Sequence, residues 1–359
     1  MTFQKILRPF TLASFFSGVI LVSLSACLPA SFQGPEKLIS SNKKFTAFNG
    51  QEPKEGDNLG IPRLIPAHTL NIGHEVYVNY CMQCHGLSGE GNGPAAQGMN
   101  PPPRNFTQGI FKFVSGKSGD LPSDADLIKT IRYGLRGTHM LPWDISQERL
   151  EAVVQYIKTF APQVWKDGST GEAWASKPNP WSGKESEALE LGKKVYHGVA
   201  QCYSCHPSYA SASDVEKYTK EMTGGGAGEM RESPHLSLLQ DSSYGHKFMP
   251  PDFTKHWIKS MHLSKTEEDE IADIYRLLGS GVGGTTMPSW EGVLSSAEDD
   301  AKRAQESHDR QWALAYYVQG LHKLKFDLSQ RKKFFEELNA KRSAKSHKHS
   351  KHLNAKNER

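Results

Sequence analysis

Two short stretches, Cys81-Met82-Gln83-Cys84-His85 and Cys202-Tyr203-Ser204-Cys205-His206, contain four of the five cysteines in this chain of 359 residues. The fifth cysteine is Cys27. In each stretch, two cysteines three positions apart are followed directly by a histidine. Because these positions span about one helical turn, both thiols and the imidazole can reach the same group together. The spacing therefore predicts two sites, each with two sulfur atoms and one ring nitrogen.

The pattern C-x-x-C-H is the attachment signature of c-type haem, in which two thiols add to the vinyl groups and the histidine binds iron. A zinc site would need a further pair of soft ligands nearby, and the only other cluster of Cys and His is the second copy of the motif. A redox-active dithiol does not require the histidine. The sequence predicts two covalently bound haems with iron. The attachment residues are Cys81, Cys84, His85, Cys202, Cys205 and His206.

The segments after the two motifs have the same order of features. A proline-rich stretch that ends in Phe-Thr comes first, and a Gly-Thr segment with a methionine then leads to a tryptophan. Each copy opens with a helical pattern, around 74–80 and 188–199. Each closes with apolar residues at helical spacing, at 150–157 and 314–321. These repeats predict two similar helical domains.

Through these motifs, residues 67–325 resemble the class I cytochrome c family, specifically the exported di-haem c-type cytochromes. The resemblance implies an all-α fold of two tandem haem domains, each a small globule whose amino- and carboxy-terminal helices cross above the haem. It also implies that histidine and methionine bind each iron from opposite sides. Met140 would then pair with His85, and Met287 with His206. Thioether ligation favours ferrous iron and raises the reduction potential.

The first copy departs from the family pattern beside its methionine. It has Leu141 between Met140 and the proline, where the family usually has methionine directly before proline. Two other side chains are therefore alternative ligands of the first iron. They are His139, whose imidazole would lower the potential, and Met99.

The second copy is longer than the first. From Cys202 to Met287 the chain covers 85 residues, against 59 from Cys81 to Met140. We expect an insertion in the second domain, with a glycine-rich surface loop and several methionines that pack in its core. Met249, which precedes a proline, is the alternative to Met287 as the ligand of the second iron.

Smaller features of the haem sites follow from the resemblance. The carbonyl of Pro94 is the expected acceptor for the second ring nitrogen of His85. A simple turn is the alternative explanation for that proline. Arg104, Trp143 and Trp290 are candidates to meet haem propionates or the edge of the ring, because buried carboxylates need donors.

The amino terminus has the pattern of an export signal. Lys5 and Arg8 precede an apolar run at 10–23 that is too short for a spanning helix. The run ends in Leu24-Ser25-Ala26-Cys27, which resembles the lipobox of bacterial lipoproteins and implies that Cys27 is lipidated. An ordinary secretory signal with an incidental cysteine is the alternative. The residue after Cys27 is not aspartate, which by resemblance to the bacterial sorting rule favours the outer membrane.

These patterns divide the chain into six parts. They are a signal peptide (1–26), a lipid-anchored tether (27–66), a first haem domain (67–165), a linker (166–184), a second haem domain (185–325), and a helix with a basic, His-rich tail (326–359). The linker is rich in Gly, Ser and Pro and has no apolar period. The tail has seven basic residues and one acidic residue in 341–359. We expect it to be irregular. Contact with anionic lipid or an acidic partner is one interpretation of its charge, and a solvated tail with no specific role is the alternative.

Charge and composition narrow the function. Lys and Arg exceed Asp and Glu by four, but the excess lies in the two ends, so the body is mildly acidic. Nucleic-acid binding is therefore excluded as a main function, and the 37% hydrophobic content excludes a multi-span membrane protein.

The resemblance implies an electron carrier of a respiratory chain, tethered at the periplasmic face of a membrane. Its partners would be other redox proteins, such as cytochromes or a terminal oxidase or reductase. No catalytic residue is predicted, because the haem performs the chemistry. Two alternatives remain. A di-haem peroxidase would need one iron with a vacant position, and a fixed cytochrome subunit of a larger oxidase or dehydrogenase complex would equally suit a lipid anchor.

Overall fold

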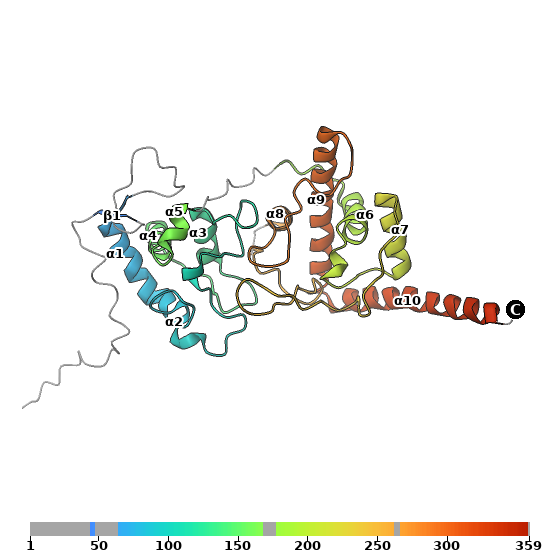
Figure 1. Cartoon of the computed structure of the whole chain (residues 1–359), viewed down its shortest axis with the longest axis horizontal. Helices are drawn as coiled ribbons and strands as arrows, with labels where there is room; N and C mark the ends of the chain where they lie inside the picture. The colour runs from blue at the N-terminus through green and yellow to red at the C-terminus, as the bar shows by residue number, and fades with distance from the viewer. Residues whose placement is uncertain (1–43, 47–63, 168–176, 262–265, 358–359) are drawn as a thin grey trace, which may run out of the picture.

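The structure of the chain is a computed structural model, and it describes residues 44–46, 64–167, 177–261 and 266–357 (Figure 1). The predicted signal peptide, the lipobox with Cys27 and most of the tether lie outside these residues. The described part is mostly helical, as predicted. Its one strand pair is β1 (Lys44–Thr46) with β2 (Leu64–Pro66), which run antiparallel.

Helices of the first half precede and follow the first Cys-x-x-Cys-His motif. They are α1 (Ala67–Val76), a π-helical turn (Tyr77–Cys81), α2 (Met82–His85), the 3₁₀ turns Pro94–Ala96 and Phe106–Gln108, α3 (Asp124–Tyr133), α4 (Gln147–Lys158) and α5 (Pro162–Asp167). The first and fourth helices pack tightly at Gly73, where a Cβ atom would lie 2.3 Å from the carbonyl oxygen of Ala152. A glycine is therefore required where α1 crosses α4.

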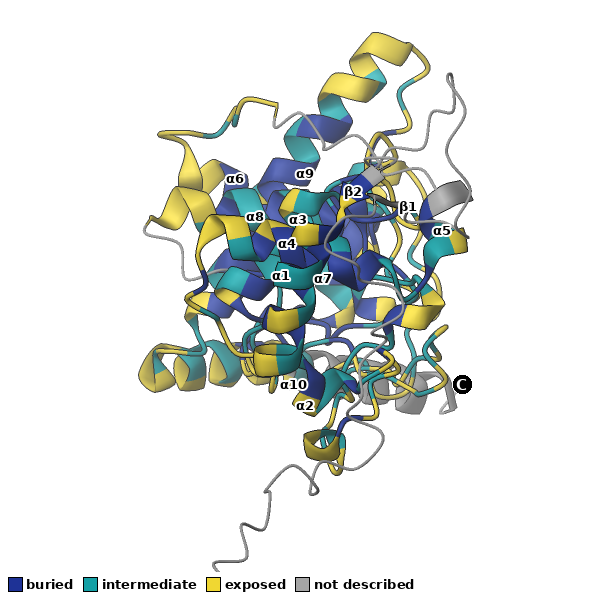
Figure 2. Cartoon of the chain, turned by 90° about the vertical axis from the view of Figure 1, so that its left-hand side faces the viewer, coloured by how far each residue is buried: buried dark blue, intermediate teal, exposed yellow. Residues whose placement is uncertain are grey.

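Helices of the second half repeat this arrangement. They are α6 (Glu185–Lys194), a π-helical turn (Val195–Val199), a 3₁₀ turn (Cys202–Ser204), α7 (Ala212–Thr223), α8 (Glu267–Ser280), α9 (Asp300–Lys323) and α10 (Leu328–Asn357). At the crossing of α6 and α9, a Cβ atom on Gly192 would lie 2.0 Å from the carbonyl oxygen of Ala313. The exposed first turns of α9 extend beyond this crossing, and its remaining length is largely buried (Figure 2).

Buried apolar residues form two clusters with no member in common. One cluster lies within residues 76–165 and the other within 188–321. Each contains the opening and closing helices of its half, together with an aromatic residue that precedes the Cys-x-x-Cys-His motif. These residues are Tyr77 in the first cluster and Tyr196 in the second, both fully buried. Each motif is therefore attached to a core of its own.

The two halves contact one another through equivalent segments. The backbone N–H of Gly283 donates to the carbonyl of Lys112 at 3.0 Å, and the N–H of Arg136 donates to the carbonyl of Lys259 at 3.1 Å. The same number of residues separates Lys112 from Lys259 and Arg136 from Gly283. The loop before each methionine therefore docks on the other half in the same way, which makes the interface approximately two-fold symmetric.

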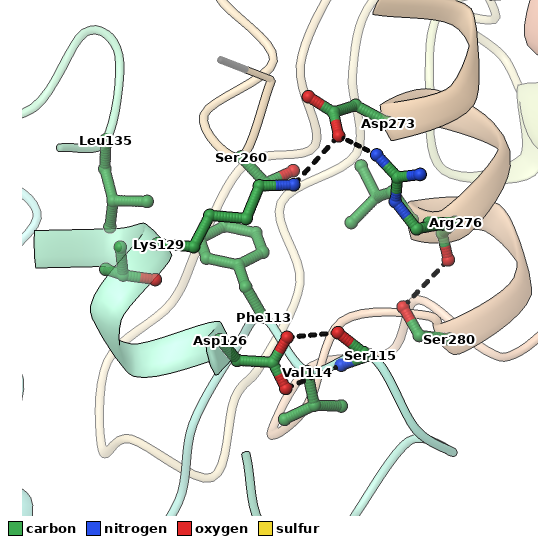
Figure 3. A pocket seen from close by; sticks show the side chains of 12 residues that line it. Phe113, Val114, Ser115, Asp126, Lys129, Leu135, Ser260, Asp273, Arg276 and Ser280 are labelled. Carbon is green, nitrogen blue, oxygen red and sulfur yellow. Dashed lines mark hydrogen bonds and ion pairs between the residues drawn. The ribbon is translucent and has the colours of Figure 1, made fainter. Parts of the chain in front are cut away.

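Helices α3 and α8 face each other across this interface. Lys129 of α3 forms an ion pair with Asp273 of α8 at 2.9 Å, and Arg276 contacts the same carboxylate. A cavity of about 60 Å³ lies between the two helices. Asp126 and Ser115 are among the residues that line it (Figure 3). Burial would raise the pKa of Asp273, but the hydrogen bonds and charges of Lys129 and Arg276 hold that pKa below its usual range.

The carboxy-terminal helix differs from the prediction. We expected a helix near 328–340 followed by an irregular basic end, whereas α10 continues to Asn357 and extends away from the rest of the molecule (Figure 1). The physical reason is composition, because no Gly or Pro follows Gly320, and Lys, Arg, Ala and Glu favour helix. Among the described residues, no helix combines the length and apolar character needed to cross a membrane.

Candidate haem sites

The first Cys-x-x-Cys-His motif lies at the end of the opening helix. Cys81 ends the π-helical turn, α2 presents Cys84 and His85, and Gly86 ends the helix with a φ of 80°. Neither thiol is in a disulfide, and both cysteines are half-buried. The hydroxyl of Tyr77 donates to the carbonyl of Gly86 at 2.6 Å and so ties the end of the motif to the core.

The ring of His85 is fixed on two sides. Its Nδ1 donates to the carbonyl of Arg104 at 3.0 Å, and its ring stacks on Phe106 with centroids 4.5 Å apart. Burial lowers the pKa of His85, which favours the neutral ring. A neutral imidazole that carries its proton on Nδ1 has a free lone pair on Nε2, the atom that a metal ion requires.

The expectation for Pro94 is wrong, because the acceptor is the carbonyl of Arg104. Pro94 instead begins a 3₁₀ turn. The preceding residue, Gly93, lies so close to α2 that a Cβ atom there would be 2.3 Å from the carbonyl oxygen of Gln83. Pro94 is thus a turn residue beside α2, which was the alternative explanation.

The second motif has the same contacts. Nδ1 of His206 donates to the carbonyl of Pro251 at 2.9 Å, and its ring stacks on Phe253 with centroids 4.8 Å apart. Burial lowers the pKa of His206 to about 4, so this ring is also neutral. The hydroxyl of Tyr196 donates to the carbonyl of Pro207 at 2.9 Å, as Tyr77 does in the first half.

One local difference separates the two motifs. Two more residues lie between Tyr196 and Cys202 than between Tyr77 and Cys81. The extra length is taken up by Gln201, which has a positive φ of 47°. The second motif therefore begins after a sharp turn instead of continuing a helix.

The two predicted methionine ligands occupy equivalent loops. Leu135 N–H donates to the carbonyl of Met140 at 2.8 Å, and Val282 N–H donates to that of Met287 at 3.1 Å. The N–H of each methionine is held by the hydroxyl of the threonine two residues before it. Both methionines are half-buried and pack against the cluster of their own half. Met249, the alternative at the second site, is 59% exposed.

The predicted residues of the first site line a common cavity of about 180 Å³. A single water needs only about 10–15 Å³, so the cavity accepts a much larger group. The cavity is lined by all four predicted residues of the first site and by both alternatives to the methionine. These residues are Cys81, Cys84, His85, Met140, His139 and Met99.

The donor set of this cavity fits a covalently attached haem. Two thiols and a neutral imidazole approach it from one short segment, and the other walls are largely aromatic and aliphatic. Two buried polar atoms without a hydrogen-bond partner also support this assignment. In the part of the chain that the structure describes, Nε2 of His246 at the first site and Nε1 of Trp290 in the second half are buried without a hydrogen-bond partner. A haem carboxylate would satisfy such atoms.

The insertion of the second half wraps around the second motif. The guanidinium of Arg231 donates to the carbonyls of Tyr203 at 3.1 Å and His206 at 2.9 Å, and also to that of Ser233 at 2.8 Å. This arginine and the stacking rings Phe106 and Phe253 were not predicted as site residues. The two phenylalanines lie in the repeated Phe-Thr segments, so the repeat contained a signal for them.

Comparisons with known proteins find a family match in the first half. Residues 68–157 match the family described as cytochrome c oxidase, cbb3-type, subunit III. No curated protein matches the chain. Among solved structures, a chain of the reducing HAO-like protein complex of Kuenenia stuttgartiensis is 29% identical with a TM-score of 0.51. The match covers 70% of this chain and 95% of that chain.

These findings support a c-type cytochrome. The matched cytochrome c domain implies covalently bound haem c with iron, and electron transfer as its role.

Proposed function

We propose that this chain is a di-haem c-type cytochrome that carries single electrons between redox partners. The observation that carries the proposal is the repetition of one geometry at both Cys-x-x-Cys-His motifs. In each half the histidine donates from Nδ1 to a backbone carbonyl and stacks on a phenylalanine. Such agreement is expected of two haem domains.

The residues of each half have distinct roles toward the haem. Cys81 and Cys84 in the first domain, and Cys202 and Cys205 in the second, would form the thioether bonds. The haem supplies the redox chemistry when it is bound. The protein holds a proton on Nδ1 of each histidine, excludes water with aromatic side chains, and offers a methionine sulfur from a hydrogen-bonded loop.

The predicted domain boundaries are part of this proposal. The support for the first haem domain (67–165) is the cluster around α1 and α4, and the support for the second (185–325) is the cluster around α6 and α9. The linker (166–184) joins them. The methionine ligands are Met140 and Met287.

We further propose that the mature chain is exported and held at the periplasmic face of a bacterial membrane, with the outer membrane favoured. The support is the sequence alone, through the apolar run at 10–23 and the lipobox that ends in Cys27. Mass spectrometry of the mature amino terminus tests this point. A diacylated or triacylated Cys27 is expected, and a free thiol on that cysteine would contradict it.

A fixed subunit of a redox complex is the second candidate function. The observation in its favour is the similarity to a chain of a reducing HAO-like protein complex, which this chain matches over 95% of that chain's length. Purification from membranes in mild detergent separates the candidates. A mobile carrier is recovered alone, whereas a fixed subunit is recovered with a stoichiometric redox partner.

The main experiment measures haem content and redox potential on the mature holoprotein. We expect two haems per chain, each with the absorption band of an iron to methionine-sulfur bond. Met140→Leu should remove the band of one haem and Met287→Leu that of the other, with a lower potential in each case. Met249→Leu is the matched control and should leave both bands intact.

Three results would overturn the proposal in different ways. One haem per chain would contradict the second domain. If the band survives in Met140→Leu and vanishes in Met99→Leu, the ligand of the first iron is Met99 and not Met140. A haem that becomes high-spin on half-reduction and reacts with peroxide would favour the peroxidase alternative.

A further inference from the structure

Four nitrogen-bearing side chains meet at one side of the first cavity. Arg104 and Lys112 come from the first half of the chain, and His246 and Lys259 come from the second. His246 lies in the insertion that distinguishes the second half. A cavity built around the first motif is therefore completed by residues of the other half.

The position of this cluster is fixed by the contacts between the halves. The ring of Tyr244 lies under Arg104, with 3.7 Å from the guanidinium carbon to the ring centroid, and 5.1 Å from the Lys112 nitrogen. Its hydroxyl donates to the carbonyl of Gly283 at 2.6 Å. Lys112 and Lys259 are each held by the backbone bond that their carbonyl accepts from the opposite half. The cluster therefore lies at the interface between the two halves.

No carboxylate among the described residues compensates the charge of this cluster. Among the described residues, Arg104, Lys112 and Lys259 form no ion pair with a carboxylate within 4.0 Å. Burial lowers the pKa of Lys112 to about 8, with further lowering by the charges of Arg104 and Lys259. Buried charges of one sign are costly unless an opposite charge is bound among them.

His246 shows where that anion would bind. Its Nδ1 donates to the carbonyl of Tyr244 at 3.2 Å, which leaves Nε2 as the atom without a partner. This Nε2 is buried beside the two lysines and the arginine. Burial, together with the charges of Lys112, Arg104 and Lys259, lowers the pKa of His246 and favours the neutral ring while no anion is bound. A bound carboxylate opposes this effect, so that His246 can take up a proton and donate from Nε2 to the anion that the lysines also contact.

We propose that Arg104, Lys112, His246 and Lys259 bind the propionate carboxylates of the first haem, so that the insertion and Lys259 of the second half complete the first haem site. The inference rests on the proposed function, because it assumes a haem attached at Cys81 and Cys84. It deepens that function by assigning a role to the insertion. The first haem then also binds the two halves of the chain together.

This arrangement has a measurable consequence for the reduction potential. Positive charges beside the carboxylates favour the ferrous state, since reduction removes one positive charge from the iron. Loss of one of these charges should therefore lower the potential of the first haem. Because Lys259 belongs to the second half, a cytochrome domain independent of its neighbour would show no such effect.

The test is a spectroelectrochemical titration of the full-length holoprotein and its Lys259→Gln and His246→Gln variants. The first haem is assigned as the one whose methionine band is lost in Met140→Leu. We expect both variants to retain two haems and to lower the potential of the first haem, the lysine variant by more. Lys259→Arg should restore the potential, because it keeps the charge.

Lys247→Gln is the matched control. It removes a charge next to His246 in the same insertion, but Lys247 is exposed and pairs with Asp241. Its potentials should equal those of the unaltered protein. The inference is overturned if the first potential is unchanged in Lys259→Gln and His246→Gln, or if Lys247→Gln lowers it equally.

The same measurements distinguish further outcomes from one another. If Lys259→Gln loses its fold by circular dichroism, Lys259→Arg and His246→Gln still decide the question. A first potential that depends on added inorganic phosphate, with no response to Lys259→Gln without phosphate, would identify a free anion as the occupant and overturn the inference. Absence of haem from Cys81 and Cys84 in the unaltered protein would contradict the proposed function itself.

Discussion

Replacement of Gly192 by alanine should weaken the second domain where α6 crosses α9. A Cβ atom at this position would lie 2.0 Å from the carbonyl oxygen of Ala313 and 2.8 Å from Cβ of Tyr317, whereas ordinary contacts begin at 3.4 Å. The nearest atom belongs to a helix backbone, so the two helices must separate by about 1 Å or more. Overpacking of this kind costs about 3 kcal/mol, and the better helix propensity of alanine returns about 1 kcal/mol. We expect a net loss of about 2 kcal/mol.

Urea unfolding of the holoprotein, followed by far-ultraviolet circular dichroism, measures this loss as a lower midpoint at an unchanged slope. Gly320→Ala is the matched control on the same helix pair, because its nearest neighbour would be Cδ1 of Leu189 at 3.4 Å. This control should be neutral or stabilised by up to about 1 kcal/mol. Equal stability of Gly192→Ala and the unaltered protein would refute the close crossing of α6 and α9.

Three further predictions concern other parts of the molecule. Tyr77→Phe removes the donor to the carbonyl after the first motif and should cost about 1 kcal/mol in urea unfolding. Asp124→Asn leaves the ammonium group of Lys158, which is 1% exposed, without its carboxylate partner. It should cost about 2 kcal/mol, less than for a fully buried pair because the side chain of Asp124 is 43% exposed. Asp273→Asn should weaken the interface by about 1 kcal/mol at pH 7, measured as a lower urea midpoint. Because the folded pKa of Asp273 is depressed, this contribution exists above about pH 4 and is lost as the pH falls through the folded pKa, so the two midpoints should converge there.

The parts of the haem sites that could be predicted from the sequence are those that local spacing determines. Cys81, Cys84 and His85 lie within one helical turn, so their chemistry depends on no distant residue. The methionine segments were recognised because Gly-Thr-x-Met occurs once in each copy. Helical periodicity likewise predicted the opening and closing helices, although the need for glycine at their crossings became visible only in the structure.

Features that depend on tertiary contacts were predicted less well. The carbonyl that accepts from His85 belongs to Arg104, because a loop returns to the motif farther along the chain than Pro94. The sequence held a usable signal for this, since Phe106 and Phe253 each lie two residues after the acceptor in its own half. The contacts between the halves involve backbone groups and lysines, which have no distinctive motif.

The position of the insertion explains how one domain could gain length without losing its haem site. The same separation relates Phe106 to Phe253 and Met140 to Met287, so the extra residues between Cys202 and Met287 all fall between His206 and its acceptor, Pro251. The hydrogen bond of 2.9 Å between these two residues closes the enlarged loop at its base. Closing a longer loop adds little entropic cost, because that cost grows only with the logarithm of length. The far part of the insertion reaches the first cavity through His246, and under the proposal above this contact serves the first haem.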